Sequence, residues 1–373
     1  MLRAVAQLAA LGLVLLFAAW LLLNLGDNMR QSRLSFGFGF LNSTAGFDIG
    51  ETLFAYSATD TYLRAFLVGL ANTLLVSLLG IILATILGVI TGVARLSKNW
   101  LVNKIAAGYV ELMRNTPLLV QLVLIYAVMI QLPSVANSIA LPGSIFLNQR
   151  GLSMPRPVTE PGFGIWLAVV LVAVGVALAA HIVAGRREDA GRSPGRLRLA
   201  GLLMVVLAAI GGGIVVGGPI GLDVPEQQRF NFVGGLTISP ELTALLFGLV
   251  IYTAAFIGEV VRGGIQAVRR GQIEAASSIG LTDMQTLRMI VFPQALRIIV
   301  PPLTSQYLNL AKNSSLAIAV GFADLFSVSR TMANQTGNPI SVIVLVMATY
   351  LVISLVTSLL MNIYNRRVQV LER

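Results

Sequence analysis

The chain has 373 residues, of which 56% are hydrophobic and 11% charged, and its mean hydropathy is +0.83. A soluble domain needs more surface charge than this, so we predict an all-α integral membrane protein that crosses the bilayer several times. The sequence has no cysteine and one histidine, His181, which excludes disulfides, cysteine catalysis and a metal site built from thiolate or several histidine ligands.

About eight apolar segments are long enough to cross a bilayer, since a spanning helix needs about 20 residues. They run over residues 4–24, 65–94, 106–132, 164–184, 199–218, 241–261, 298–322 and 340–363. The first segment is long for the apolar core of a signal peptide, and no small-residue cleavage site follows it. We therefore expect it to be retained as a transmembrane helix.

The charge is uneven, with 26 basic residues against 16 acidic ones and a net charge of +10. In a membrane protein such an excess indicates topology rather than nucleic-acid binding. Basic residues cluster at Arg95, Lys98 and Lys104, in the linker 185–198, at Arg269 and Arg270, and at Arg366 and Arg367. The positive-inside rule places these clusters and both termini in the cytoplasm, with the loops 25–63, 133–163 and 219–240 outside.

A polar stretch interrupts the apolar pattern at residues 271–293, GQIEAASSIGLTDMQTLRMIVFP. Gly280 follows a run of helix formers and is suited to end a helix, while Thr282 and Gln285 form a capping box that begins the next one. We expect the second helix to end at Phe292, because Pro293 disfavours helical geometry in the preceding residue. The topology makes this helix pair cytoplasmic. Its residues alone fit a docking element for another protein and an interfacial hairpin that joins two spans about equally well.

Residues of this stretch resemble the EAA loop of ABC-importer permeases, whose pattern is E-A-A-x3-G-x9-I-x-L-P. The matching residues are Glu274, Ala275, Ala276, Gly280, Ile290 and Pro293, and Phe292 stands where leucine is usual. Flanking stretches resemble the polar amino-acid branch of that family, at residues 69–80, 111–122, 258–276 and 310–321. The long chain is most similar to the permease subunits of general L-amino-acid uptake systems.

The resemblance implies a type I ABC-importer permease core with a cytoplasmic coupling helix. Such a permease is a translocation subunit rather than an enzyme, and it moves L-amino acids across the bacterial inner membrane by ATP-driven, binding-protein-dependent transport. The implied partners are a second, unlike permease subunit, two ATPase subunits and a periplasmic amino-acid-binding protein. ATP and Mg are expected on the ATPase, with no cofactor on this chain, which lacks the phosphate-binding G-x4-G-K-[ST] motif.

The same resemblance implies a domain division. Residues 1–63 would form an N-terminal transmembrane helix with a periplasmic loop, and residues 64–366 a type 1 ABC transmembrane domain. An inserted region, 133–239, would carry two extra helices, and residues 367–373 a cytoplasmic tail. The role of the inserted region stays open.

Charged and polar residues inside apolar segments are the remaining candidates. Glu111 with Arg114 and Glu259 with Arg262 are spaced i,i+3 near the cytoplasmic ends of spans, so each pair either anchors a helix end or acts in a gate. Lys312 has no acidic residue within four positions, so it faces a wet cavity, a carboxylate on another helix such as Asp324 or Glu259, or the substrate.

Further candidates for the translocation pathway are the polar residues Asn313, Ser314, Thr116 and Asn72, which the helix packing alone can also explain. An ion-coupled secondary amino-acid transporter is the alternative function, although it would more naturally carry acidic residues in the middle of the membrane. An intramembrane enzyme would need a nucleophile and a base within a span, which this composition does not favour.

Overall fold

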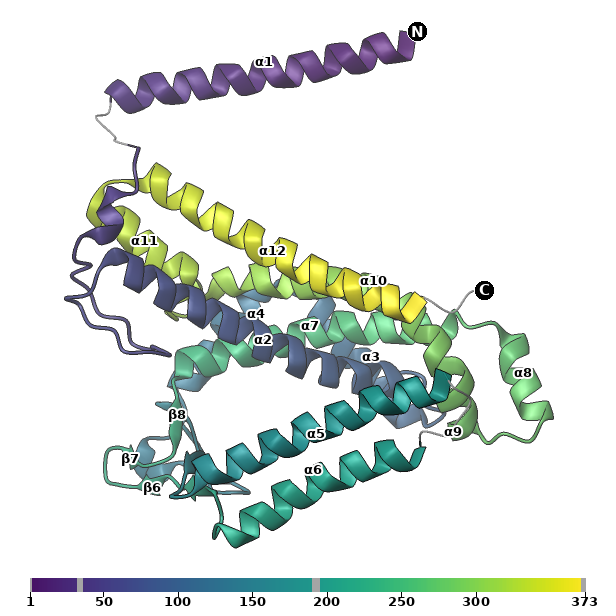
Figure 1. The fold of residues 1–373 in the computed structure, drawn as a ribbon. Coiled ribbons are helices and arrows are strands. Elements are labelled where there is room, and N and C mark those ends of the chain that lie inside the picture. The colour runs from purple at the N-terminus through teal and green to yellow at the C-terminus, as the bar shows by residue number, and fades with distance from the viewer. Residues whose placement is uncertain (1, 32–35, 190–194, 370–373) are drawn as a thin grey trace. The chain divides into compact units, whose positions relative to one another are not determined.

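A computed structural model describes residues 2–31, 36–189 and 195–369. Parts of the predicted linker and of the predicted tail, residues 190–194 and 370–373, lie outside the described residues. The main helices are α1 (Leu2–Gln31), α2 (Tyr62–Ala94), α3 (Trp100–Asn115), α4 (Leu118–Ile130), α5 (Phe163–Asp189), α6 (Gly195–Val215), α7 (Pro240–Gln266), α8 (Arg270–Ser278), α9 (Asp283–Thr286), α10 (Phe292–Asn313), α11 (Leu325–Thr336) and α12 (Pro339–Gln369) (Figure 1).

Short helical turns and strands complete the fold. The turns are η1 (Gly39–Asn42), η2 (Val135–Asn137), the π-helical η3 (Leu287–Val291) and η4 (Ser314–Ala319). The strands are β1 (Ile139–Leu141), β2 (Ile145–Asn148), β3 (Gly151–Met154), β4 (Arg156–Thr159), β5 (Ile220–Asp223), β6 (Glu226–Gln227), β7 (Phe232–Val233) and β8 (Leu236–Ile238).

Within the described residues, six helices are long and apolar enough to cross a membrane, or seven if the bent pair α3 and α4 is one span. The six comprise α2, α7, a continuous stretch Asp283–Ala319, and the apolar parts of α5, α6 and α12. Helix α1 contains a shorter apolar stretch, Ala6–Leu21. The multi-pass helical fold predicted from composition is therefore confirmed.

The segment predicted as one span over 106–132 is instead broken. Helices α3 and α4 meet at an angle of 107°, with Thr116 in an extended conformation between them. Pro117 explains the break, because the residue before a proline is disfavoured in the helical region and proline has no N–H to donate. Periodic hydrophobicity continued across the break and concealed it.

The chain divides into two compact units, residues 1–128 with 241–373, and residues 129–240. In the first unit α2 packs against α11, and α12 lies beside α10 (Figure 1). Helices α2 and α7 approach closely at Gly88 and Gly92, where an added Cβ would come within 2.5 Å of Ile257 and 2.7 Å of the Gly258 carbonyl oxygen. Close helix packing therefore requires glycine at these two positions.

The second unit contains an antiparallel hairpin of α5 and α6 and the small β-sheets (Figure 1). The indole Nε1 of Trp166 donates a hydrogen bond to the Ala209 carbonyl at 2.8 Å, which ties the two helices together. The strands form an antiparallel sheet in the order β1-β2-β3-β8 and two antiparallel pairs, β4 with β5 and β6 with β7. Strands β1 to β4 precede the helical hairpin in the sequence and β5 to β8 follow it. Their pairing therefore joins the two ends of the hairpin segment.

Candidate functional site

A short exposed helix, α8, carries the Glu274-Ala275-Ala276 sequence and ends in a defined cap. Gly280 has φ +83°, and its N–H donates to the Ser277 carbonyl at 3.0 Å, while the Leu281 N–H donates to the Ala276 carbonyl at 3.1 Å. These two bonds form a Schellman motif, in which a left-handed residue reverses the chain after the helix. Gly280 therefore sets the direction in which the chain leaves α8.

The next helix begins with the predicted capping box. The Thr282 hydroxyl accepts from the Gln285 N–H at 3.3 Å, and the Gln285 side chain accepts from the Thr282 N–H at 2.9 Å. The expected stop at Phe292 is wrong, because the helix continues through η3 into α10 and Pro293 lies in the first turn of α10. A proline is tolerated there, since the π-helical turn before it leaves no hydrogen bond for the missing N–H.

The surface of this coupling element, residues 270–291, combines small and exposed apolar side chains. Ile279 and Met284 are 76% and 71% exposed, and Met289 is also exposed. Ala276 is buried, while Glu274 lies on the exposed side of α8. Apolar side chains with this exposure next to a rigid turn are typical of a surface that another protein covers.

An ion pair joins the coupling element to the loop after α2. Lys98 Nζ lies 2.8 Å from Asp283 Oδ2, and the side chains are 92% and 90% exposed. Their hydrogen bond raises the pKa of Lys98 and lowers the pKa of Asp283, so both groups stay charged over a wide pH range. Solvent screens such an exposed pair, so it aligns the two segments without contributing much to stability.

A charged cluster lies at the end of α7 that leads to the coupling element. The Glu259 carboxylate accepts from Arg262 at 2.5 Å, as the i,i+3 spacing predicted, and also from Arg95, which caps the end of α2. The expected pair of Glu111 with Arg114 does not form within the described residues, and the Arg114 guanidinium instead lies 5.4 Å above the Phe256 ring. The side chains of an exposed i,i+3 pair are free to choose other partners, and here the packing of α3 beside α7 offers Arg114 an aromatic face.

A polar pocket of about 320 Å³ lies between α7 and α10. Its lining residues are Tyr252, Thr253, Phe256, Gln306, Asn309 and Asn313. The three amides stand at i, i+3 and i+7 on one face of α10, and within the described residues none of them has a hydrogen-bond partner. Asn313 was a candidate from the sequence, whereas Gln306 and Asn309 were missed although their spacing would have identified the stripe.

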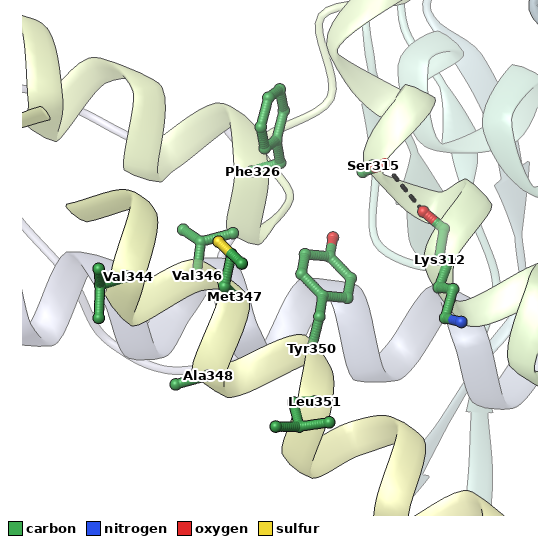
Figure 2. Close-up of a pocket in the computed structure, with 9 residues that line it drawn as sticks. All are labelled: Lys312, Ser315, Phe326, Val344, Val346, Met347, Ala348, Tyr350 and Leu351. Carbon is green, nitrogen blue, oxygen red and sulfur yellow. Dashed lines mark hydrogen bonds between the residues drawn. The ribbon is translucent and has the colours of Figure 1, made fainter. Parts of the chain in front are cut away.

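Lys312 lies in a different place from its neighbour Asn313. It lines a cavity of about 730 Å³ with Ser315 and with side chains of α11 and α12, among them Phe326 and Tyr350 (Figure 2). No ion pair to Asp324 or Glu259 forms within the part of the chain that the structure describes, so neither carboxylate is its partner. The Asp324 side chain caps α11 by accepting from the Ser327 N–H at 2.9 Å.

Three other candidates are engaged by nearby groups. The Asn72 amide donates to the carbonyl oxygens of Glu51 at 2.9 Å and Ala323 at 2.8 Å. The Thr116 hydroxyl bonds the Leu112 carbonyl and accepts from Gln121, and the Ser314 hydroxyl bonds the Ala311 carbonyl. The Asn72 bonds join α2 to two loops, whereas the Thr116 and Ser314 bonds lie at the break between α3 and α4 and at the end of α10.

Comparison with known proteins places this fold in a family. The model of the binding-protein-dependent transport system inner membrane component matches residues 197–370. The chain is 43% identical to the general L-amino acid transport system permease protein AapQ of Rhizobium johnstonii, covering 98% of this chain and 92% of the relative.

Two further relatives match over nearly the full length. The putative amino-acid ABC transporter permease protein YhdX of Escherichia coli is 43% identical over 98% of this chain and 94% of its own. The glutamate/glutamine/aspartate/asparagine transport system permease protein BztB of Rhodobacter capsulatus is 41% identical over 98% of this chain and 93% of its own. The chain therefore belongs to the family of amino-acid ABC transporter permeases, which are translocation subunits of the inner membrane rather than enzymes.

Proposed function

We propose that this chain imports L-amino acids across the bacterial inner membrane and is driven by ATP hydrolysis on separate ATPase subunits. The observation that carries the proposal is the coupling element, a rigid exposed turn between two spans whose direction Gly280 and the Thr282 cap define. A rigid element of this kind transmits a displacement from a docked protein into α7, which ends before it, and α10, which follows it. ATP and Mg bind the ATPase, and this chain supplies the surface that follows its movement.

The docking element contains the residues whose pattern matches the EAA loop, with Ala276 buried beneath its surface. They are Glu274, Ala275, Ala276, Gly280, Ile290 and Pro293. Exposed Ile279 and Met284 supply apolar contact area, and Ala275 allows the close approach of a partner backbone. Glu274 adds one negative charge to this surface, and this charge helps to orient the docked partner.

The orientation of the chain in the membrane follows from the basic residues near the coupling element. With Arg269, Arg270 and Lys98 in the cytoplasm, both termini are cytoplasmic, and the β-sheets of residues 139–238 face the periplasm. A periplasmic amino-acid-binding protein then delivers substrate to the face opposite the coupling element. The type 1 transmembrane domain comprises residues 64–366, after the N-terminal segment 1–63 and before the tail 367–373. Residues 133–239 are an insertion within this domain.

The translocation pathway runs along the polar pocket of α7 and α10. Gln306, Asn309 and Asn313 offer donors and acceptors to both charged ends of an amino acid, and these amides, which have no partner among the described residues, lie on one helix face. A second, unlike permease subunit closes the other wall, so the working unit is a hetero-dimer. The charged cluster joins Arg95, which follows α2, to Glu259 and Arg262 near the cytoplasmic end of α7, and it acts as a gate.

The experiment is uptake of labelled amino acids by vesicles that contain this chain, a second permease subunit and the binding protein, with and without the ATPase and ATP. Uptake that requires both ATPase and ATP supports the proposal. Uptake that persists without ATP and follows an imposed ion gradient would identify a secondary transporter instead. Co-purification of a tagged copy with the second permease, but not with an untagged copy of itself, tests the hetero-dimer.

A further inference from the structure

Helix α11 lies in the segment between two spans, Asp283–Ala319 and Pro339–Arg366. The coupling element lies at the start of the first of these spans and α11 follows its other end, so α11 lies on the opposite, outer side of the membrane. Its apolar face, formed by Leu325, Val328 and Met332, is buried against α2 and α12. The other face of α11 carries polar side chains.

A pocket of about 320 Å³ lies on that polar face. Its lining residues are Ile318, Gly321, Ser327, Arg330, Thr331 and Asn334. Ser327, Arg330, Thr331 and Asn334 are spaced i, i+3, i+4 and i+7, so they form one continuous stripe along the helix. The polar pocket between α7 and α10 also has a volume of about 320 Å³. Its lining residue Asn313 comes shortly before Ile318 of the present pocket in the sequence.

Arg330 is the one charged residue that lines this pocket. Arg330 is exposed, and no hydrogen bond or ion pair joins its guanidinium to any residue that the structure describes. The hydroxyl oxygen of Ser327 is buried and likewise has no partner among the described residues. The nearest acidic residue along the chain, Asp324, is occupied by the helix cap and by the Tyr350 hydroxyl at 3.5 Å.

These groups share one chemistry. An unpaired guanidinium binds a carboxylate through two parallel hydrogen bonds, and a neighbouring hydroxyl and amide complete such a site. A buried hydroxyl without a partner favours a ligand that accepts its hydrogen. The six lining residues include no carboxylate, and that of Glu241, whose Cγ would lie 3.9 Å from a Cβ on Gly321, accepts from the Tyr126 hydroxyl at 2.9 Å.

We propose that this outer pocket is an entry site, in which Arg330 binds the α-carboxylate of an amino acid before the substrate reaches the pocket of α7 and α10. The inference rests on the proposed function, and it adds to that function a site on the periplasmic side. Ser327 and Asn334 donate to the carboxylate, while the Thr331 hydroxyl, which donates to the Ser327 carbonyl at 3.3 Å, lines the pocket wall, and Ile318 contacts the apolar part of the substrate. The occupant is a small carboxylate ligand rather than the binding protein.

A cysteine placed in the pocket gives a local test, because the chain has no cysteine of its own. Asn334→Cys is reacted with a membrane-impermeant thiol reagent in the assembled importer, with and without amino acid and without binding protein. At about ten times its Kd, an amino acid that fills the pocket leaves about one tenth of the sites free, so modification slows about 10-fold. An analogue with a carboxamide in place of the carboxylate does not protect.

Arg330 is tested in the same background. Arg330→Gln raises the amino-acid concentration needed for protection about 10-fold or more, because a charge-assisted pair of hydrogen bonds is lost, whereas Arg330→Lys raises it less. Arg229→Cys, on the periplasmic β-sheet region outside the pocket, is the control and shows no protection. Thr331→Cys replaces Asn334→Cys if the latter does not assemble.

Two results overturn the proposal. One is a modification rate at residue 334 that saturating amino acid leaves unchanged, and the other is protection by the empty or loaded binding protein alone, which makes the pocket a protein contact. ATP-dependent uptake by the same vesicles before modification is measured in parallel. Failure of uptake counts against the proposed function, while normal uptake without protection counts against the entry site only.

Discussion

Lys98, in the loop after α2, and Asp283, the first residue of α9, form an ion pair of 2.8 Å between segments far apart in the sequence. The pair joins the coupling element to the loop that connects α2 and α3. Because solvent screens the pair, we expect it to align the two segments while both side chains are charged.

The Lys98–Asp283 pair is expected to persist over a wide pH range. Its hydrogen bond lowers the pKa of Asp283, so the contribution of the pair is present above the ordinary aspartate pKa and is lost as the pH falls through the lower value in the folded state. The distance between spin labels on flanking positions should stay constant from neutral pH down to about 4 and increase below it. Asp283→Asn should show the longer distance at every pH.

Glu259 is expected to matter more for stability than its exposure suggests. Its side chain is 27% exposed and bonds two arginines, so Glu259→Gln leaves Arg95 and Arg262 without their carboxylate and should cost about 1–3 kcal/mol. Thermal unfolding in detergent measures the loss. Glu111→Gln, which removes a carboxylate without an ion pair among the described residues, is the matched control and should leave the unfolding temperature unchanged; equal losses would refute this assignment.

Gly280 is expected to control the geometry of the coupling element. Gly280→Ala places a Cβ on a residue with φ +83° and should cost about 1 kcal/mol locally, shifting the direction in which the chain leaves α8. The stimulation of ATPase activity by the loaded binding protein should fall while the membrane domain stays folded. Gly271→Ala in α8, where the added Cβ meets nothing within 4 Å, should retain the stimulation. If Gly271→Ala also abolished the stimulation, the effect would belong to any change in α8 and not to the geometry at Gly280.

Glu274 is expected to affect docking without affecting folding. Glu274→Lys reverses the charge on the exposed side of α8, so a tagged permease should co-purify with less ATPase and ATP-driven uptake should fall. Lys104→Glu, an exposed charge reversal on α3, is the control for a general electrostatic effect. Normal uptake and normal ATPase stimulation by the Glu274 variant would contradict the docking assignment.

Gly92 is expected to be needed for the packing of α2 on α7. An added Cβ would lie 2.7 Å from the Gly258 carbonyl oxygen, and backbone atoms cannot move aside as a side chain does. Gly92→Ala should destabilise the protein by about 1–3 kcal/mol. Gly108→Ala in α3, where nothing lies within 4 Å, should be neutral or stabilising in the same unfolding measurement.

Local features of this chain were predictable from the sequence because their causes act over a few residues. Apolar runs marked the spans, and the Thr282–Gln285 capping box and Gly280 marked the turn of the coupling element. The same local reasoning was wrong at Pro293, where a π-helical turn lets the helix continue, and at Pro117, where an apolar run concealed a bend of 107°. A proline restricts the chain, but its neighbours decide whether the helix bends, ends or begins there.

The sequence by itself determined that the chain is a multi-pass helical protein with a capped turn between two spans, since burial in lipid and capping depend on residues close together. Only the tertiary structure decided which polar side chains meet. Arg95 joins Glu259, Lys98 joins Asp283, and Gln306 lines one pocket with Thr253, because the close approach of α2 and α7 at their glycines and the packing of α7 beside α10 bring distant residues within reach. No local pattern encodes such pairs, so the site depends on how the helices pack.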